Sequence, residues 1–367
     1  MTRHPRLRPV VLVSVVLAVV AHPVPAAAQP RLAAVQPAPV QRCVVTDDRL
    51  AELSGLAADA EHWYAVSDGG RRLQVAVLRK DCSLQRMITA AVDPFDVEDL
   101  ALAADGRLWL ADVGDNSRSR ATIAVHVLPP QGAPALHRLT YPDGPHDAEA
   151  LVLDRQDRPY VITKELLGGP GVYRPTGPLA GPGPTPLERV ATVRLPRSAT
   201  PGGPTRTRGA TLITGAATTA DGAVLALRTY TDAFLFPVRD GDLVAAFAGE
   251  PVQVPLPDEP QGEAVAFEPD GTLLSGSERA TAGPQPIRAV PDAAALAQPA
   301  PAEPPASSPP TSPPTASTQD GQAGEAAAQH SPEGGDRSPP DWQVFLVAVL
   351  AAAAVVVVIS RVGRRAG

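Results

Sequence analysis

Three glutamates, Glu98, Glu149 and Glu263, each stand at the start of a short apolar stretch in a pattern that recurs along the chain. Carboxylates that converge on one point repel each other, which raises their pKa values unless a cation or a basic group lies among them. Carboxylate oxygens with no cysteine or histidine beside them favour calcium or magnesium over zinc. We therefore interpret the three glutamates as a divalent-cation site, with Ca²⁺ as the candidate cofactor. The alternative is that each caps backbone amides or pairs with a basic residue.

Further polar residues recur in step with the glutamates. Ser54 and Thr214 take the place of the glutamate in two other copies of the pattern. A polar cluster also follows the second apolar stretch of each copy. These clusters supply the other candidates for a shared polar mouth, namely Asp68, Asp112, Asp115, Asn116, Lys164, Arg228 and Glu278. For residues 112–116 a polar loop without a binding role is the alternative.

The motifs of the common enzyme classes are absent from the sequence. It contains no GxSxG, HExxH, paired CxxC, Walker A or GxGxxG pattern. His146 is three residues from Glu149, but it follows a Pro-Asp-Gly-Pro turn, so we interpret it as a solvent-facing histidine. No residue stands out as a nucleophile, and catalytic residues are not assigned.

The elements that carry these residues form an internal repeat. Each copy has an apolar strand, a turn that often contains Asp-Gly, and a second apolar strand. The copies start at residues 54, 98, 149, 214 and 263, so the spacings are 44, 51, 65 and 49 residues. A four-stranded propeller blade has about 40 to 50 residues, and Asp-Gly is a strong hairpin signal. We predict an all-β chain with a five-bladed β-propeller; a sixth blade in the longest interval and a β-sandwich are the alternatives.

Propeller geometry brings the polar residues together. The first strand of a blade lines the central channel and the second returns beside it, so the start of one and the end of the other lie on the same face. The candidate residues should therefore surround one mouth of the channel. The last copy lacks a fourth strand, which residues 43–46 could supply from the other end of the chain.

The strand starts with Glu-Ala or Glu-Asp-Leu-Ala, followed by Asp-Gly hairpins, resemble those of secreted β-propellers of the phytase-like, NHL and SMP-30-like kind. The resemblance covers about residues 50–280. It implies the propeller fold and, as one functional alternative, calcium-dependent hydrolysis of the phytase-like or SMP-30-like type.

Cys43 and Cys82 are the only cysteines, and both lie in the part of the chain that we expect to be exported. Exported proteins form disulfides, so we predict one between them. Free thiols or metal binding are the alternatives.

The two ends of the sequence have targeting and anchoring patterns. A basic start, an apolar run of about a dozen residues and three alanines predict a secretory signal peptide. A long apolar run before three arginines predicts a membrane-spanning helix with the N-terminal side outside the cell. The predicted order is signal peptide 1–28, flexible segment 29–41, propeller 42–290, Pro/Ala/Ser-rich stalk 291–340, transmembrane helix 341–360 and cytoplasmic tail 361–367.

The net charge and the predicted membrane anchor limit the classes of partner that the protein can have. The chain carries a formal charge of −7, and six arginines lie in the signal peptide and the tail, so residues 29–360 carry −13. Such a charge argues against nucleic acid as a partner. We predict a single-pass membrane protein whose extracellular propeller binds an unknown ligand or protein as a binding or scaffold module. The alternative is a calcium-dependent hydrolase or lactonase.

Overall fold

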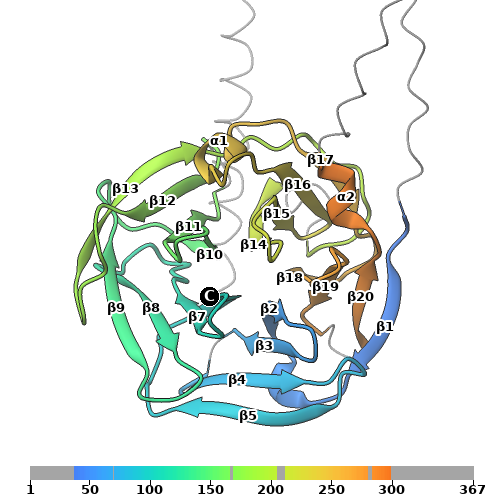
Figure 1. Cartoon of the computed structure of the whole chain (residues 1–367), viewed down its shortest axis with the longest axis horizontal. Helices are drawn as coiled ribbons and strands as arrows, with labels where there is room; N and C mark the ends of the chain where they lie inside the picture. The colour runs from blue at the N-terminus through green and yellow to red at the C-terminus, as the bar shows by residue number, and fades with distance from the viewer. Residues whose placement is uncertain (1–36, 69, 166–167, 205–210, 280–282, 299–367) are drawn as a thin grey trace, which may run out of the picture. The chain divides into compact units, whose positions relative to one another are not determined.

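The computed structural model describes residues 37–68, 70–165, 168–204, 211–279 and 283–298. Within these residues, twenty strands form five antiparallel groups of four that are arranged around a central axis (Figure 1). The predicted all-β, propeller-like fold is therefore confirmed. The predicted signal peptide, transmembrane helix and tail, and most of the predicted stalk, lie outside the described residues.

In each group the first strand faces the axis and the following strands lie successively farther out (Figure 1). The first group is β2 (Leu53–Ala58), β3 (Trp63–Ser67), β4 (Leu73–Leu78) and β5 (Leu84–Ala90). The second is β6 (Val97–Leu102), β7 (Leu108–Asp112), β8 (Ile123–Leu128) and β9 (Ala135–Thr140). The third is β10 (Ala148–Leu153), β11 (Pro159–Thr163), β12 (Gly171–Pro175) and β13 (Thr185–Thr192). The fourth is β14 (Ile213–Thr218), β15 (Val224–Thr229), β16 (Asp232–Pro237) and β17 (Val252–Pro255).

The fifth group joins the two ends of the described chain. It contains β18 (Gly262–Phe267), β19 (Leu273–Ser277) and β20 (Gln285–Val290), and its outer strand is β1 (Val40–Val45). β1 pairs antiparallel with β20, which confirms that the N-terminal residues supply the missing fourth strand. A short parallel contact between β9 and β13 also links the second and third groups.

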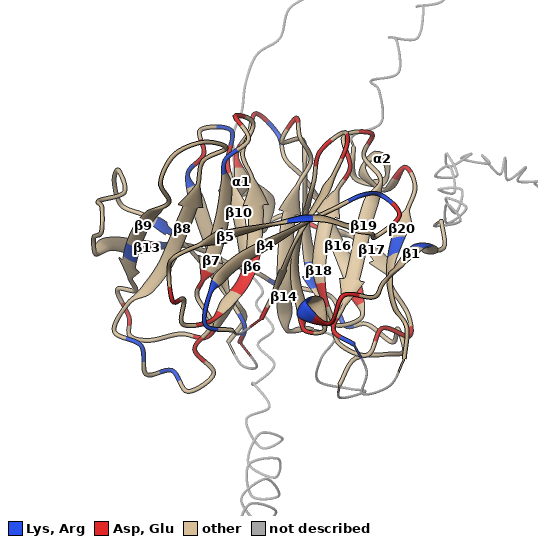
Figure 2. Ribbon diagram, turned by 90° about the horizontal axis from the view of Figure 1, so that it is seen from below, with Lys and Arg blue, Asp and Glu red and all other residues tan. Residues whose placement is uncertain are grey.

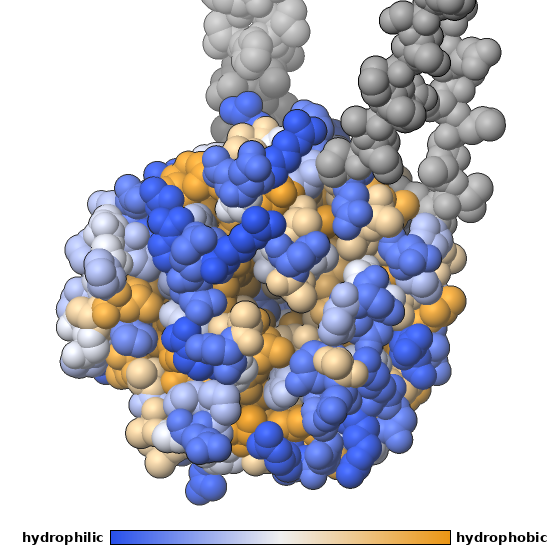
Figure 3. All heavy atoms as spheres, in the orientation of Figure 1, coloured by the Kyte–Doolittle hydropathy of each residue, from blue (hydrophilic) through white to orange (hydrophobic). Residues whose placement is uncertain are grey.

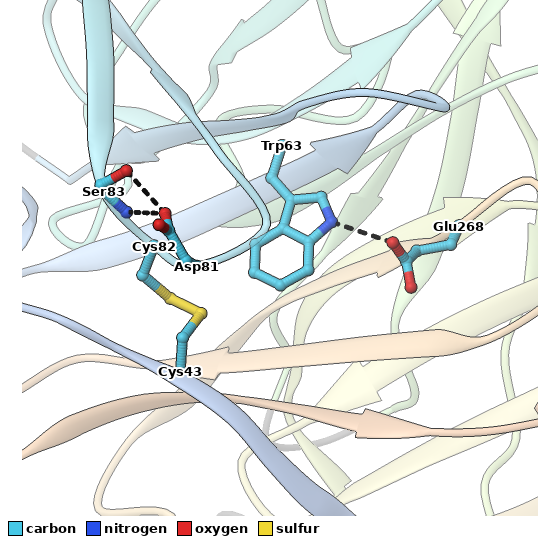
Figure 4. The surroundings of a disulfide bond; sticks show 6 residues. All are labelled: Cys43, Trp63, Asp81, Cys82, Ser83 and Glu268. Carbon is cyan, nitrogen blue, oxygen red and sulfur yellow. Dashed lines mark hydrogen bonds between the residues drawn. A yellow bond between two sulfur atoms is a disulfide. The ribbon is translucent and has the colours of Figure 1, made fainter.

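A disulfide fastens this closure. Cys43 of β1 bonds Cys82 in the turn between β4 and β5, with the two Cα atoms 5.7 Å apart, so the predicted disulfide is confirmed (Figure 4). Beside it the Trp63 indole donates a hydrogen bond to Glu268, 3.3 Å away, which ties the first group to the fifth (Figure 4). The disulfide thus links β1, the outer strand of the fifth group, to the first group.

Apolar side chains pack between neighbouring groups all the way around the ring. Each of five buried clusters combines residues from two adjacent groups, and the cluster around Leu53 and Ile287 joins the fifth group to the first. Strands that are covered on both faces need apolar residues at successive positions rather than at alternate ones. This explains runs such as β8 and β18, in which every residue is buried.

Two short helices, α1 (Leu243–Phe247) and α2 (Ala293–Ala297), lie at the same end of the ring. The sequence pattern assigned residues 291–298 to the stalk, whereas Ala293, Ala294 and Ala297 are buried against the fourth and fifth groups. Small alanines can cover the end of a sheet closely, so they belong to the folded unit. Among the described residues, no helix is long and apolar enough to span a membrane.

Candidate functional site

The same irregularity occurs in the innermost strand of every group. The pairing register shifts by one residue at Ser54, Glu98, Glu149 and Thr214, and likewise at Glu263 and its neighbour Ala264. A β-bulge leaves one residue unpaired and turns its side chain away from the regular alternation. The five positions that the sequence repeat singled out are therefore bulge positions. Their side chains are at most 4 % exposed.

The two hydroxyl residues connect neighbouring inner strands. Ser54 Oγ donates to the Glu98 carbonyl oxygen at 2.5 Å, and Thr214 Oγ1 donates to the Gly262 carbonyl oxygen at 2.9 Å. Ser54 Oγ also lies 3.4 Å from Glu98 Oε2. Both hydroxyls hold the backbone at the mouth, and Ser54 in addition contacts a glutamate that we predicted to bind metal.

An acidic cluster lies at the end of the channel where the innermost strands begin, which is the predicted mouth. Oxygen atoms of Asp68, Asp96 and Glu98 all lie within 4.8 Å of one another. Acidic residues of β6 and β18 lie toward the same end of the ring (Figure 2). Asp96 was not predicted; it lies two residues before Glu98 and immediately precedes β6. A polar residue at this position also precedes the other glutamates, as Asp147 and Gln261 show, so the repeat contained the signal.

The carboxylates hold protons tightly in the absence of a cation. Burial, and then the charge of Glu149, raise the pKa of Glu98 to about 11. Burial, and then a hydrogen bond with Asp68, raise the pKa of Asp96 to about 7. Burial and the charges of Glu149 and Glu278 raise the pKa of Glu263 well above its ordinary value. The negative charges of the three predicted glutamates therefore act on one another, as expected for residues around one mouth.

One glutamate has a basic partner. Lys164 donates a hydrogen bond to Glu149 Oε1, and its ammonium lies 5.3 Å from the centre of the Tyr230 ring. Despite this partner, burial raises the pKa of Glu149 to about 8. Its other oxygen, Oε2, is buried without a hydrogen-bond partner among the described residues. Lys164 thus neutralises part of the mouth and leaves one carboxylate oxygen unused.

Glu263 and Glu278 share an amide. Gln261 Nε2 donates to Glu263 Oε1 at 3.1 Å and also to Glu278. Glu278 follows β19, as the repeat predicted for a residue at the mouth. Since an amide brings no charge, these two carboxylates keep their mutual repulsion.

Several predicted mouth residues have a different role in the structure. Asp112 is buried and accepts hydrogen bonds from the backbone amides of Phe95 and Asp96, at 3.1 and 3.0 Å, and from Arg120. Asp115 accepts from the amides of the loop that follows it. Asn116 is exposed. Asp112 therefore fixes the backbone at Asp96 through its amide, and Asp115 and Asn116 are not among the residues of the cluster.

Arg228 is not a residue of the open mouth either. It is fully buried and forms an ion pair with Glu259, which was not predicted. Its guanidinium occupies the space beside Gly262, where a Cβ atom would lie 1.7 Å from Nη2. Gly262 of β18, the residue before Glu263, therefore makes room for the buried guanidinium group of Arg228.

A second glycine makes room for the acidic cluster. A Cβ atom on Gly114 would lie 2.2 Å from Glu98 Oε1 and 2.4 Å from Asp96 Oδ2. The carboxylates thus approach the backbone more closely than any other residue would permit.

His146 is half-buried rather than solvent-facing. Its Nδ1 lies 3.0 Å from Glu165, and its Nε2 lies 3.0 Å from Asp143 and 3.2 Å from the Tyr173 hydroxyl. These hydrogen bonds hold it within the third group.

Hollows adjoin both ends of the channel. Beside Asp68, a cavity of about 420 Å³ is lined by Arg71, Arg72 and other residues of the first group. At the other end, a cavity of about 590 Å³ is lined by the far ends of the five inner strands, with many alanines and leucines. Figure 3 looks onto this apolar hollow and the polar side chains around it.

Comparison with known proteins gives fold-level likeness alone. No family model matches the chain, and no curated protein matches its sequence. Among solved structures, a gluconolactonase from Xanthomonas campestris is 18% identical, with 65% of this chain and 72% of that chain covered and a TM-score of 0.39. A luciferin-regenerating enzyme is 13% identical, with 67% and 79% covered and a TM-score of 0.39. A virginiamycin B lyase from Staphylococcus aureus is 10% identical, with 68% and 72% covered and a TM-score of 0.33. Similarity at this level does not inform the activity of this chain.

Proposed function

We propose that this chain is a cell-surface binding module whose acidic mouth holds a divalent cation, most simply calcium. The observation that carries the proposal is the close approach of Asp68, Asp96 and Glu98, with Glu149 and Glu263 near enough to repel them. Buried carboxylates are costly unless a cation lies among them. Lys164 and the side-chain amide of Gln261 compensate only part of the negative charge of these carboxylates.

The proposed ligand set differs from the one that the sequence predicted. Asp68, Asp96 and Glu98 form its centre, and Glu149 and Glu263 lie at its border. Calcium takes six to eight oxygen ligands, so waters, carbonyl oxygens or the Ser54 hydroxyl would complete the shell. Gly114 provides the space that brings two of these carboxylates together.

We also propose the architecture that would place this mouth outside the cell. The five strand groups are five blades, a signal peptide (1–28) exports the chain, and the helix at 341–360 anchors it by way of the stalk. The first strand, β1, starts beside Ala289, and α2 follows β20, so both described ends leave the ring on the side of the apolar cavity.

Calcium is expected to stabilise the purified full-length chain. A ligand that binds only the folded state adds about 2.7 kcal/mol at a hundredfold excess over its Kd. Thermal melting in millimolar calcium should therefore occur at a higher temperature than in EDTA, and Glu98→Gln should remove most of the gain. The matched control is Glu188→Gln. Glu188 lies on the outer strand β13 and pairs with Arg174 of β12, and neither residue belongs to the proposed ligand set. Equal melting temperatures of the wild type in both buffers would refute the cation site.

The calcium effect is expected to grow with pH. The folded-state pKa values of Asp96 and Glu149, about 7 and 8, are above those of the unfolded chain, near 4. Protonation therefore stabilises the metal-free fold below about pH 4, and this contribution is lost as the pH rises through 7 and 8. Calcium competes with these protons, so the gain in melting temperature over EDTA should increase between about pH 6 and pH 8.5. A gain that is constant or falls over this range would contradict the carboxylate ligands.

The second candidate function is that of a calcium-dependent hydrolase or lactonase. The observation that favours it is Glu149 Oε2, an unpartnered carboxylate oxygen that could serve as a general base beside a metal-bound substrate. A panel of lactones and phosphoesters, assayed with and without EDTA, separates the two functions. Turnover that stops in EDTA and in Glu98→Gln would establish the enzyme and displace the binding module.

A further inference from the structure

One fully buried carboxyl group lies among the inner strands, next in sequence to Glu98 of the mouth. Asp99 follows Glu98 on β6 and has no exposed surface. Its Oδ1 accepts a hydrogen bond from the Leu100 amide at 2.8 Å. Its Oδ2 accepts from the amides of Leu151 on β10 and Ala216 on β14, at 2.9 and 3.1 Å. One side chain therefore connects three of the five inner strands.

The amides that Asp99 binds need a partner. An innermost strand pairs with its own group on one side only, so the N–H groups on its other edge point toward the axis. A buried amide without an acceptor costs free energy comparable to a lost hydrogen bond. No described basic side chain pairs with Asp99, so its hydrogen bonds are directed wholly at backbone amides.

The other inner strands leave space for this one carboxylate. The residues that directly follow Ser54, Glu149, Thr214 and Glu263 in the other inner strands are small, namely Gly55, Ala150, Gly215 and Ala264. A Cβ atom on Gly55 would lie 2.8 Å from Asp99 Cα and from the Leu100 amide nitrogen. A single acidic residue thus fills the axis where four other strands have almost no side chain.

The position of Asp99 connects it to the mouth. Glu98 is its neighbour on β6, Leu151 is two residues after Glu149 on β10, and Ala216 is two residues after Thr214 on β14. Each of the three strands thus has a bulge residue of the mouth within two positions of the hydrogen bond. A shift of β10 or β14 relative to β6 would move Glu149 or Thr214 away from Glu98.

We infer that Asp99 is the positioning residue of the mouth: it fixes β6, β10 and β14 at one level and so sets the separation of Glu98 and Glu149. The inference rests on the proposed cation site, which it deepens. Hydrogen-bonded residues behind the ligands of a metal orient those ligands, and their loss lowers metal affinity about 10- to 100-fold. Asp99 touches no cation itself and acts through the strands.

The test compares Asp99→Asn with Val75→Ala in the full-length chain. Asparagine keeps the size but replaces one acceptor oxygen with a donor group, which cannot bind an amide N–H. Val75 is buried on β4 in an apolar cluster that also contains Val97 and Leu100 of β6, but its side chain forms no hydrogen bond, so its truncation destabilises the fold and leaves the hydrogen bonds of Asp99 in place. Calcium affinity is measured by titration calorimetry, and hydrogen exchange is followed in peptides that cover β10 and β14. Asp99→Ser, which adds no bulk and keeps one acceptor, takes the place of Asp99→Asn where the latter does not fold.

In Asp99→Asn we expect a loss of calcium affinity of about 10-fold or more and faster exchange in β10 and β14. Val75→Ala should leave affinity within about twofold of the wild type. Unchanged affinity, or an equal loss in both variants at matched stability, would overturn the inference. Should the wild type bind no calcium, the cation site fails, and the exchange data decide on Asp99 alone: faster exchange supports it and unchanged exchange overturns it.

Discussion

Replacing Glu259 with alanine is expected to lower the free energy of unfolding by about 3 to 5 kcal/mol, the usual cost of removing one partner of a buried ion pair. Glu259 is the partner of Arg228, which has no exposed surface. Two guanidinium nitrogens of Arg228, Nε and Nη1, are already without hydrogen bonds among the described residues. Burial lowers the pKa of Arg228, which shows how strongly the interior disfavours its charge. Without Glu259 the buried positive charge of Arg228 would lose the carboxylate with which it forms its ion pair.

Urea unfolding of the full-length chain measures this effect. The control is Glu188→Ala, which removes a partly exposed ion pair with Arg174 and should cost less than about 1 kcal/mol. A double variant, Arg228→Met with Glu259→Met, should recover much of the loss, because apolar residues often replace a buried pair without penalty. A loss below about 1 kcal/mol in Glu259→Ala would mean that water reaches Arg228.

Removing the disulfide is expected to cost about 2 to 4 kcal/mol. The bond between Cys43 and Cys82 spans 39 residues and fastens β1, the strand that completes the fifth group, to the first group. Without it, β1 can leave β20 and open the ring while the rest of the chain stays folded. The unfolded chain also gains conformational freedom when the cross-link is absent.

The double variant Cys43→Ser with Cys82→Ser tests this expectation by thermal melting. A reducing agent should lower the melting temperature of the wild type and leave that of the double variant unchanged. Thiol titration of the native protein should detect no free thiol. Two reactive thiols, or a wild type that is indifferent to reductant, would contradict a structural role for the bond.

The two predictions concern parts of the ring that support the mouth. Arg228 is close enough to Glu263 for the two charges to interact, and a Cβ atom at Gly262 would overlap its guanidinium group. The disulfide keeps the fifth group, which carries Glu263, next to the first, which carries Asp68. Variants at either place are therefore expected to weaken calcium binding only as far as they open the ring.

Patterns local to the chain were sufficient to predict the strands. Alternating apolar stretches and Asp-Gly turns predicted the inner hairpins, such as the turn at Gly106, where φ is 83°. The spacing of the copies predicted a ring, and residues 43–46 were correctly assigned to its closing strand. These features depend on backbone conformation and on burial of apolar surface, which neighbouring residues in the sequence largely decide.

Side-chain partners across groups could not be predicted in the same way. The repeat indicated Asp112 and Arg228 as mouth residues, because each ends a second strand. In the structure Asp112 holds the amide of Asp96, and Arg228 pairs with Glu259, which lies in a connection without a repeat signal. Whether a polar residue points to the mouth or to the interior depends on which residues of the neighbouring strand group lie within hydrogen-bond distance of it. The sequence does not give these distances.

The sequence by itself therefore determined the all-β repeat, the closing strand, the pair of cysteines and the recurrence of Glu98, Glu149 and Glu263. Only the tertiary structure showed that a bulge turns each of these glutamates, that Asp96 joins Glu98, and that Asp99 spans three strands. The physical reason is that strand formation follows from local apolar patterns, whereas charge compensation is decided over a few ångströms between residues tens of positions apart.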